Sequence, residues 1–532
     1  MPGPAHASPW HPFAIDGPHS ATPDTPASSP ALDYKEVTPM PQNTTALRPS
    51  TGQQPHLARS LSNRHIQLIA IGGAIGTGLF MGSGKTISLA GPSVIFVYMI
   101  IGFMLFFVMR AMGELLLSNL EYKSFSDFAA DLLGPWAGFF TSWTYWLCWI
   151  VTAIAELIAI ALYTSFWWPD LPLWIPALVA VLILLGLNLT SVKAFGETEF
   201  WFALIKIVAI VTLIVVGLVM VITHFQSPGG APASFNNLWN DGGMFPTGPM
   251  GFIAGFQLSV FAFLGVELVG TTAAEAQDPE KNLPKAINSI PIRILLFYVL
   301  ALIVIMAVTP WREVRADASP FVAMFALAGL GAAAAVINFV VLTSATSSAN
   351  SGLYSTSRML FGLSVEGTAP GRFQLLSRHK VPANALLFSC MFLLVSAVLL
   401  YASSSIIAVF TVVTTMASVL FIFVWAIIVV SYIVYRKRRP ALHAASKFRM
   451  PGGVYMCYVV LAFFAFLIWA LTQKTDTLQA LLVTPVWFVG LGVVWMILRR
   501  RPEQAAHHEL HRVTVAADRE AALAFRAGVH RG

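Results

Sequence analysis

The stretch IGGAIGTGLFMGSGKT, from Ile71 to Thr86, carries six glycines and ends in Gly-Lys-Thr, as nucleotide-binding loops do. A Walker A loop requires a glycine, four residues and then Gly-Lys-Ser/Thr, but the residue at that distance before Gly84 is Leu79. The dinucleotide pattern G-x-G-x-x-G also fails, because Gly76 and Gly78 are followed by Met81. The glycines therefore serve a purpose other than phosphate binding.

The composition places this stretch in a membrane protein. Of the 532 residues, 57% are hydrophobic and 11% are charged, and the mean hydropathy is +0.72, whereas soluble proteins contain about 25% charged residues. The apolar residues form runs of about 20, enough to cross about 30 Å of hydrocarbon as helices. The net charge of +7 lies mainly in short connections and tails and gives no reason to expect nucleic acid as a partner. The three cysteines are not spaced as disulfide or zinc pairs.

We predict an all-α membrane domain of twelve transmembrane helices over residues 57–498. Residues 1–56, rich in Pro, Ser, Thr and Ala, are predicted to form a disordered tail, and residues 499–532 a charged tail whose HHELH cluster is interpreted as a solvated helix face rather than a metal site. Lys and Arg gather in alternate connections, which predicts that both tails are cytoplasmic. The spans are expected at about 66–86, 93–117, 137–166, 172–192, 201–223, 250–273, 291–310, 328–357, 384–401, 407–434, 454–472 and 478–498.

Two of the expected helices contain residues that oppose a continuous helix. The first span has a glycine-rich middle, from Gly72 to Gly78, and the sixth has Gly265 beside Glu267 in FAFLGVE. They occupy matching positions in spans 1–5 and 6–10, which is typical of an inverted-repeat transporter with a midplane site between broken helices. We therefore interpret the amides from Ile75 to Gly78 as an anion-binding site at a half-helix N-terminus. Close helix packing is the alternative reason for the glycines.

Several long segments carry a resemblance to a known family, among them NRHIQLIAIGGAIGTGLFMGSGKTISLAGPS, RAMGELLLSNLEYKSFSDFA, ELVGTTAAEAQDPEKNLPKAINSIPIRI and TSRMLFGL. From about Leu57 to Leu498 the chain resembles the amino acid permeases of the amino acid–polyamine–organocation superfamily. The resemblance implies a secondary active transporter with a five-plus-five inverted repeat, broken helices 1 and 6, and no cofactor. It also implies that small neutral amino acids, such as D-serine, D-alanine and glycine, enter the cell with protons across a bacterial inner membrane.

The resemblance further implies a substrate site made largely of backbone groups. The amides of the unwound first span would bind the substrate carboxylate, and carbonyl oxygens of spans 1 and 6 its ammonium group. The Phe261 ring would close over the substrate as a gate. The residues concerned are Gly76, Thr77 and Gly78 for the carboxylate, and Ala74, Phe261 and Leu264 for the ammonium group.

Ionisable residues inside the membrane are functional candidates, because each costs about 2.5–3.5 kcal/mol near mid-membrane. Glu267 is expected to bind the coupling proton, to order the broken helix, or to be a hydrogen-bonded structural acid. Lys206 in span 5 either extends to the interface or, as in the proton-coupled relatives that it resembles, changes charge with conformation. Glu156 in span 3 either contacts the substrate or makes a structural pair.

Four other features were assigned from their positions. Glu114 and Arg110, near the inner end of span 2, are expected to form a gate or an interfacial pair, and Glu275 is expected to belong to an inner gate. The hydroxyl groups between Thr343 and Ser351 either contribute to a cation site or bond within their own helix. The aromatic residues of WTYWLCW, 143–149, are expected either to pack as an interfacial aromatic belt facing lipid or to form a wall of the substrate site.

Three alternatives to this function remain open from the sequence. Sodium could replace the proton, the substrate could be another neutral, aromatic or GABA-like amino acid, or the protein could be a sensor that binds amino acids without moving them. An enzyme is not expected, since no nucleophile–base pair or metal cluster is recognisable. The oligomeric state and the side-chain and chiral selectivity have no signal in the sequence.

Overall fold

The apolar runs form helices, which satisfy their backbone polar groups within one segment. The computed structural model describes residues 75–122, 124–189, 192–226, 231–268, 270, 278–327, 329, 331–378 and 380–529, and of residues 192–196, 198, 503, 528 and 529 the backbone alone. All of them belong to one unit, Leu57–Gly532. Within these ranges the regular structure is helical, apart from an isolated bridge between Gln226 and Pro232.

Nine helical segments of the described residues are long and apolar enough to cross a membrane. Two shorter apolar helices, at Trp174–Asn188 and Gly248–Phe263, accompany them. The helices up to residue 263 are α2 (Thr77–Phe80), α3 (Gly82–Ala90), η1 (Gly91–Ser93), α4 (Val94–Ser118), α5 (Phe125–Leu133), α6 (Pro135–Thr164), α7 (Trp174–Asn188), α8 (Val192–Ile222), η2 (Phe235–Leu238), α9 (Gly248–Ser259) and η3 (Val260–Phe263).

The later helices continue the same pattern, with short connecting helices between long apolar ones. They are α11 (Pro279–Asn288), α12 (Ile290–Arg293), the π-helical η5 (Ile294–Val299), α13 (Leu300–Val308), η6 (Trp311–Glu313), α14 (Pro320–Leu327), α15 (Gly331–Val365), η7 (Gly371–Gln374), α16 (Ala383–Leu393), α17 (Val395–Ala402), α18 (Ile406–Arg438), α19 (Pro440–Ala445), α20 (Gly453–Leu471), α21 (Thr475–Leu498) and α22 (Pro502–Val529).

Most predicted ends lie within a few residues of the observed ones, but two helices differ. Helix α8 begins at Val192 rather than at 201, and Glu199, which lies before the expected start, is buried inside the fold. Helix α15 continues to Val365, beyond the expected 357. The sixth expected span is interrupted after Phe263, at the break that its sequence predicts, and Leu268 and Gly270 are helical again.

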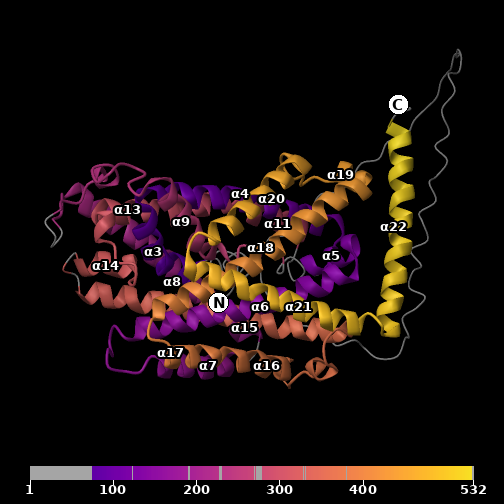
Figure 1. Cartoon of the computed structure of the whole chain (residues 1–532), viewed down its shortest axis with the longest axis horizontal. Helices are drawn as coiled ribbons and strands as arrows, with labels where there is room; N and C mark the ends of the chain where they lie inside the picture. The colour runs from indigo at the N-terminus through magenta and orange to yellow at the C-terminus, as the bar shows by residue number, and fades with distance from the viewer. Residues whose placement is uncertain are drawn as a thin grey trace, which may run out of the picture. The chain divides into compact units, whose positions relative to one another are not determined.

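Helix α6 lies in the interior of the bundle. Helix α6 packs against both α15 and α18, which cross the middle of Figure 1. The most apolar window of α6 is 83% buried, against 22% for α21. Helices α7, α16 and α17 pack together along the lower edge of the same view. A side chain on α6 therefore faces protein on most sides, which makes this helix the support for the candidate site.

Arg439, which follows α18, connects three elements at one end of the bundle. It donates to Asp131 of α5 at 2.7 Å and to Asp518 of α22 at 2.9 Å. Burial alone would raise the pKa of Asp131, but the hydrogen bonds and charge of Arg439 hold that pKa below its ordinary value. The C-terminal helix is thereby attached to the bundle through a charge pair.

Candidate functional site

The short helix α2 crosses η3 at a point where two backbones nearly touch. A Cβ atom added to Gly78 would lie 2.5 Å from the Cα atom and 2.7 Å from the amide nitrogen of Ala262. It would also lie 2.8 Å from the carbonyl carbon of Phe261. Because carbon atoms pack at about 3.5–4.0 Å, only glycine permits this approach. The crossing brings together the two predicted halves of the site.

On the other side of α2, a carboxylate from α6 meets the start of the helix. The backbone is extended at Gly76 (φ −127°, ψ −161°), and the helix begins at Thr77. The Thr77 amide donates to Oε1 of Glu156 at 3.4 Å. A Cβ at Gly76 would lie 2.7 Å from the same Glu156 oxygen, so glycine is needed for the carboxylate to approach. The Glu156 carboxylate therefore accepts a hydrogen bond from one of the amides that were predicted to bind an anion.

A second carboxylate lies where the helix of η3 ends. Leu264 is extended (ψ 140°) and Gly265 has φ +94°, a conformation that favours glycine. The Gly265 amide donates to Oε2 of Glu267 at 3.2 Å, and the Tyr145 hydroxyl of α6 donates to Oε1 at 3.1 Å. Glu267 is fully buried. The side chain therefore satisfies a backbone amide that the interrupted helix leaves unpaired, and Tyr145 connects it to α6.

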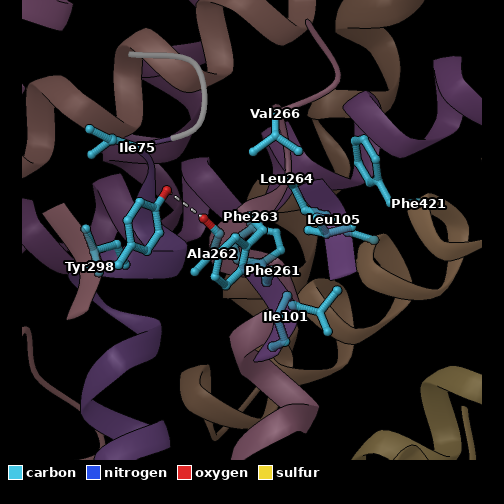
Figure 2. Close-up of a cluster of buried hydrophobic side chains, with 14 of the residues drawn as sticks. Ile75, Ile101, Leu105, Phe261, Ala262, Phe263, Leu264, Val266, Tyr298 and Phe421 are labelled. Carbon is cyan, nitrogen blue, oxygen red and sulfur yellow. Dashed lines mark hydrogen bonds between the residues drawn. The ribbon is translucent and has the colours of Figure 1, made fainter. Parts of the chain in front are cut away.

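Apolar side chains surround the crossing, as Figure 2 shows for Phe261, Leu264 and Phe421. The Phe261 ring is buried and packs edge-on against Phe410 of α18, with ring centroids 6.1 Å apart. The carbonyl of Ala262 accepts the Tyr298 hydroxyl at 3.0 Å, the dashed contact in Figure 2. The carbonyl of Phe261 accepts the Leu264 amide at 3.3 Å and keeps one lone pair for a further donor.

Lys206 of α8 is fully buried and does not extend to a polar surface. The interfacial interpretation of this lysine is therefore wrong. Its electrostatic partners are Glu199 of α8 and Glu156 of α6. Lys206 thus interacts electrostatically with Glu156, whose carboxylate accepts the Thr77 amide of α2. This interaction connects the fifth expected span with the first.

Some hydroxyl groups of α15 bond to residues outside the helix and others bond within it, and their part in a cation site stays a prediction. Ser344 donates to the Ile75 carbonyl at 3.1 Å, and Ser347 donates to Glu199 at 2.8 Å. Thr343 and Thr346, in contrast, bond to carbonyls within their own helix. The inward face of α15 therefore supports the backbone just before α2.

Glu114 belongs to a different cluster. It is fully buried in α4, where it pairs with Nδ1 of His443 at 2.5 Å and accepts the Tyr432 hydroxyl at 2.8 Å. It also accepts the amide of Met450. Arg110 instead donates to Asn288 and to the carbonyl of Arg449. The direct pair expected between Glu114 and Arg110 is replaced by one with His443, so this cluster connects α4 with α18 and α19.

The structure brings together Ile75, Gly76, Thr77, Gly78, Phe261, Leu264 and Glu156, with Lys206 and Glu267 at the edges. Ala74 and Glu275 lie outside the described residues. Sequence reasoning missed Tyr145, which had been treated only as part of WTYWLCW although it is only 2% exposed, and Glu199. The signal for Tyr145 was its spacing of eleven residues from Glu156, about three helical turns, which places both on one face.

This arrangement can hold a dipolar molecule between backbone groups and exchange protons at buried carboxylates. Within the described part of the chain, no three His, Cys, Asp or Glu side chains gather closely enough to hold a metal ion. The neighbouring groups are amides, carbonyls, hydroxyls and carboxylates, which suit recognition of an ammonium carboxylate.

Comparisons with known proteins place this geometry in a family. The family model described as amino acid permease matches residues 65–508. The D-serine/D-alanine/glycine transporter of Escherichia coli (strain K12) is 68% identical over 445 residues, which cover 84% of this chain and 95% of that protein. The amino-acid permease AapA of Bacillus subtilis is 53% identical over 450 residues, or 85% and 97% of the two chains. The probable threonine/serine transporter YbxG of the same organism is 44% identical over 439 residues, or 82% and 94%.

Proposed function

Because the chain belongs to the amino acid permease family, we propose that it imports D-serine, D-alanine and glycine together with protons. It is a multi-pass membrane transporter and not an enzyme. The 68% identity with a transporter named for these three substrates supports the specificity. The observation that carries the proposal is the crossing of α2 and η3, where the Gly78 position touches the Ala262 backbone between two buried carboxylates.

The proposed binding mode uses backbone groups for both ends of the amino acid. The amides of Gly76, Thr77 and Gly78 receive the substrate carboxylate at the start of α2. Carbonyl oxygens at Phe261 and Leu264, with Ala74 before α2, receive the ammonium group. Phe261 closes over the substrate by changing its packing against Phe410. These contacts recognise the α-amino acid group common to all three substrates, while the buried surroundings favour a small side chain.

Glu156 connects substrate binding with proton uptake in this proposal. Its Oε1 atom already accepts the Thr77 amide, so an arriving substrate carboxylate meets a second carboxylate at the same donor. Two adjacent carboxylates in a buried site cannot both carry a charge without a large penalty. Glu156 is therefore expected to take up a proton as the substrate binds. This coupling needs no part of the substrate side chain.

Lys206 and Glu267 transmit this change to the two broken helices. Lys206 interacts with Glu156, so neutralising Glu156 removes one of the charges that favour the lysinium form. Glu267 holds the Gly265 amide and is proposed to release it when the sixth span moves. Glu114 and Glu275 are proposed to act at the inner gate, and Glu114 does so through its pair with His443.

The proposed topology has twelve spans with a five-plus-five inverted repeat over residues 57–498. One of the nine candidate segments contains both α3 and α4, which belong to the first and second expected spans. The two shorter apolar helices contain α7 and α9, which belong to the fourth and sixth. Counted in this way, the segments support twelve spans. Residues 1–56 and 499–532 are proposed as cytoplasmic tails of a bacterial inner-membrane protein.

Uptake into proteoliposomes tests the proposal. An inward proton gradient is expected to accelerate the accumulation of labelled glycine, with D-alanine and D-serine competing and sodium having no effect. Uptake that requires sodium and continues after the proton gradient is collapsed would contradict the coupling. Binding of the three amino acids without flux would contradict transport itself and favour a sensor.

A further inference from the structure

Glu199 is a buried acid that the proposed mechanism does not use. It lies seven residues before Lys206 in α8, about two turns away on the same helix face. Glu199 is 2% exposed and Lys206 is 0% exposed, and Glu199 is the first of the two carboxylates that act electrostatically on this lysine. A buried carboxylate of this kind is retained only when it is paired and hydrogen-bonded.

Two side chains of α15 form hydrogen bonds with the carboxyl group of Glu199. Ser347 donates to its Oε2 atom at 2.8 Å, and the Asn350 amide group donates to Oε1 at 3.1 Å. Asn188 of α7 donates through Nδ2 to the Leu184 carbonyl, which can only accept, and through the same nitrogen to Oδ1 of Asn350 at 2.7 Å. The nitrogen of Asn350 must therefore face Glu199 and donate to Oε1, while the Ser347 hydroxyl, which can donate or accept, contacts Oε2.

Glu156, the other carboxylate near Lys206, is held much less firmly. Its Oε1 atom accepts the Thr77 amide at 3.4 Å. Its Oε2 atom is buried and makes no hydrogen bond of normal geometry with the described residues. Of the two carboxylates that act on Lys206, α6 supplies Glu156. Helix α15 supplies Ser347 and Asn350 to Glu199, and α7 supplies Asn188 to Asn350.

We propose that Glu199 is the permanent counter-ion of Lys206, held ionised by Ser347 and Asn350, and that this leaves Glu156 as the carboxylate that exchanges the coupling proton. The inference rests on the proton-coupled transport proposed above. Glu199 is a positioning residue, since it acts through Lys206 and does not touch the substrate. It gives the buried network one fixed negative charge and one exchangeable charge, so that Lys206 stays charged while Glu156 gains and loses the coupling proton.

The consequence is a defined shift in the pH dependence of transport. An anion beside a lysine favours the charged lysine, and removing it lets the proton leave at a lower pH. In Glu199→Gln, the pH above which proton-driven uptake declines is expected to fall by about one to three pH units. Asn350→Ala, which removes one donor to Glu199, is expected to shift the decline in the same direction by a smaller amount.

The experiment compares four proteins in proteoliposomes: the wild type, Glu199→Gln, Asn350→Ala and Thr346→Ala. Thr346 is the matched control, because it lies on α15 but its hydroxyl bonds to Leu342 within that helix. Labelled glycine uptake is measured from pH 5 to pH 9 under a constant inward proton gradient, and glycine–glycine exchange is measured without a gradient. Exchange reports an intact site, whereas the position of the uptake decline reports the protonation of Glu156 and Lys206 together.

The inference is supported if both network variants keep exchange and move the decline to lower pH, while Thr346→Ala matches the wild type. It is overturned if Glu199→Gln exchanges glycine and retains the wild-type pH profile. Should Glu199→Gln fail to reach the membrane, an unshifted profile in Asn350→Ala overturns the inference instead. A wild type whose uptake ignores the proton gradient would contradict the proposed function, which is a separate outcome.

Discussion

The substitution Gly78→Ala tests the crossing of α2 and η3. The added Cβ would lie 2.5 Å from the Cα atom of Ala262, about 1 Å closer than carbon atoms normally approach. The atoms that the added Cβ would meet belong to the backbone of Phe261 and Ala262, which cannot move aside as a flexible side chain does. Overpacking of this kind costs about 1–3 kcal/mol. If α2 and η3 separate to relieve it, both ends of the substrate lose their alignment with the backbone groups.

The expected result is weaker substrate binding with the fold retained. A loss of about 1–3 kcal/mol corresponds to a dissociation constant for D-alanine raised about 5- to 150-fold. The assay is isothermal titration of purified protein in detergent, together with glycine uptake in proteoliposomes. Gly186→Ala is the matched control, because a Cβ at that position in α7 has no atom within 4 Å and alanine is the better helix former.

The reasoning fails if Gly78→Ala binds D-alanine with wild-type affinity while Gly186→Ala behaves as expected. That outcome would mean that the two backbones are not in contact when substrate is bound. A loss of binding in both variants would point to general destabilisation, and the thermal midpoint of unfolding distinguishes this from a local effect.

Two further predictions follow from contacts of α6 and α5. Tyr145→Phe removes the hydroxyl that donates to buried Glu267 and is expected to lower the free energy of unfolding by about 1.5–3 kcal/mol, the range for a hydrogen bond to a charged group. Tyr163→Phe is the control, since the Tyr163 hydroxyl has no partner among the described residues. Equal thermal midpoints of unfolding for the two variants would contradict the hydrogen bond between Tyr145 and Glu267. The lowered pKa of Asp131 means that its ionised form stabilises the fold above its unfolded pKa of about 3.9, and that this stabilisation is lost as the pH falls through the lower folded value. Asp131→Asn is therefore expected to lower the midpoint at pH 7 and to approach the wild type below about pH 4, whereas a deficit that persists unchanged in acid would exclude the pairing with Arg439.

The helical membrane fold follows from features that a single sequence contains. The length of the apolar runs and the low charge content predict spanning helices, and the glycines Gly76 and Gly265 lie where α2 begins and shortly after η3 ends. These are local properties, since they depend on backbone hydrogen bonding and on the conformational freedom of glycine. They place the extended residues Gly76 and Leu264 next to positions that had been selected from sequence alone.

The partners of the buried charges could not be predicted in the same way. Glu199 lies before the expected start of the fifth span at 201, yet it is buried within α8 and contacts Asn350 and Ser347 of a distant helix. Glu114 had an apparent partner one turn away in Arg110, but the fold brings His443 to it instead. Such pairs depend on tertiary packing between helices far apart in sequence, which periodicity does not encode.

The central claim is that bare peptide groups at two interrupted helices hold both ends of an amino acid. The most direct test is an experimental structure of the full chain with D-alanine bound. The substrate carboxylate is expected within hydrogen-bond distance, about 2.7–3.2 Å, of the Thr77 and Gly78 amides, with its ammonium group beside the carbonyls of Phe261 and Leu264. A continuous helix through Gly76 and Gly265, or D-alanine bound away from their crossing, would contradict the account.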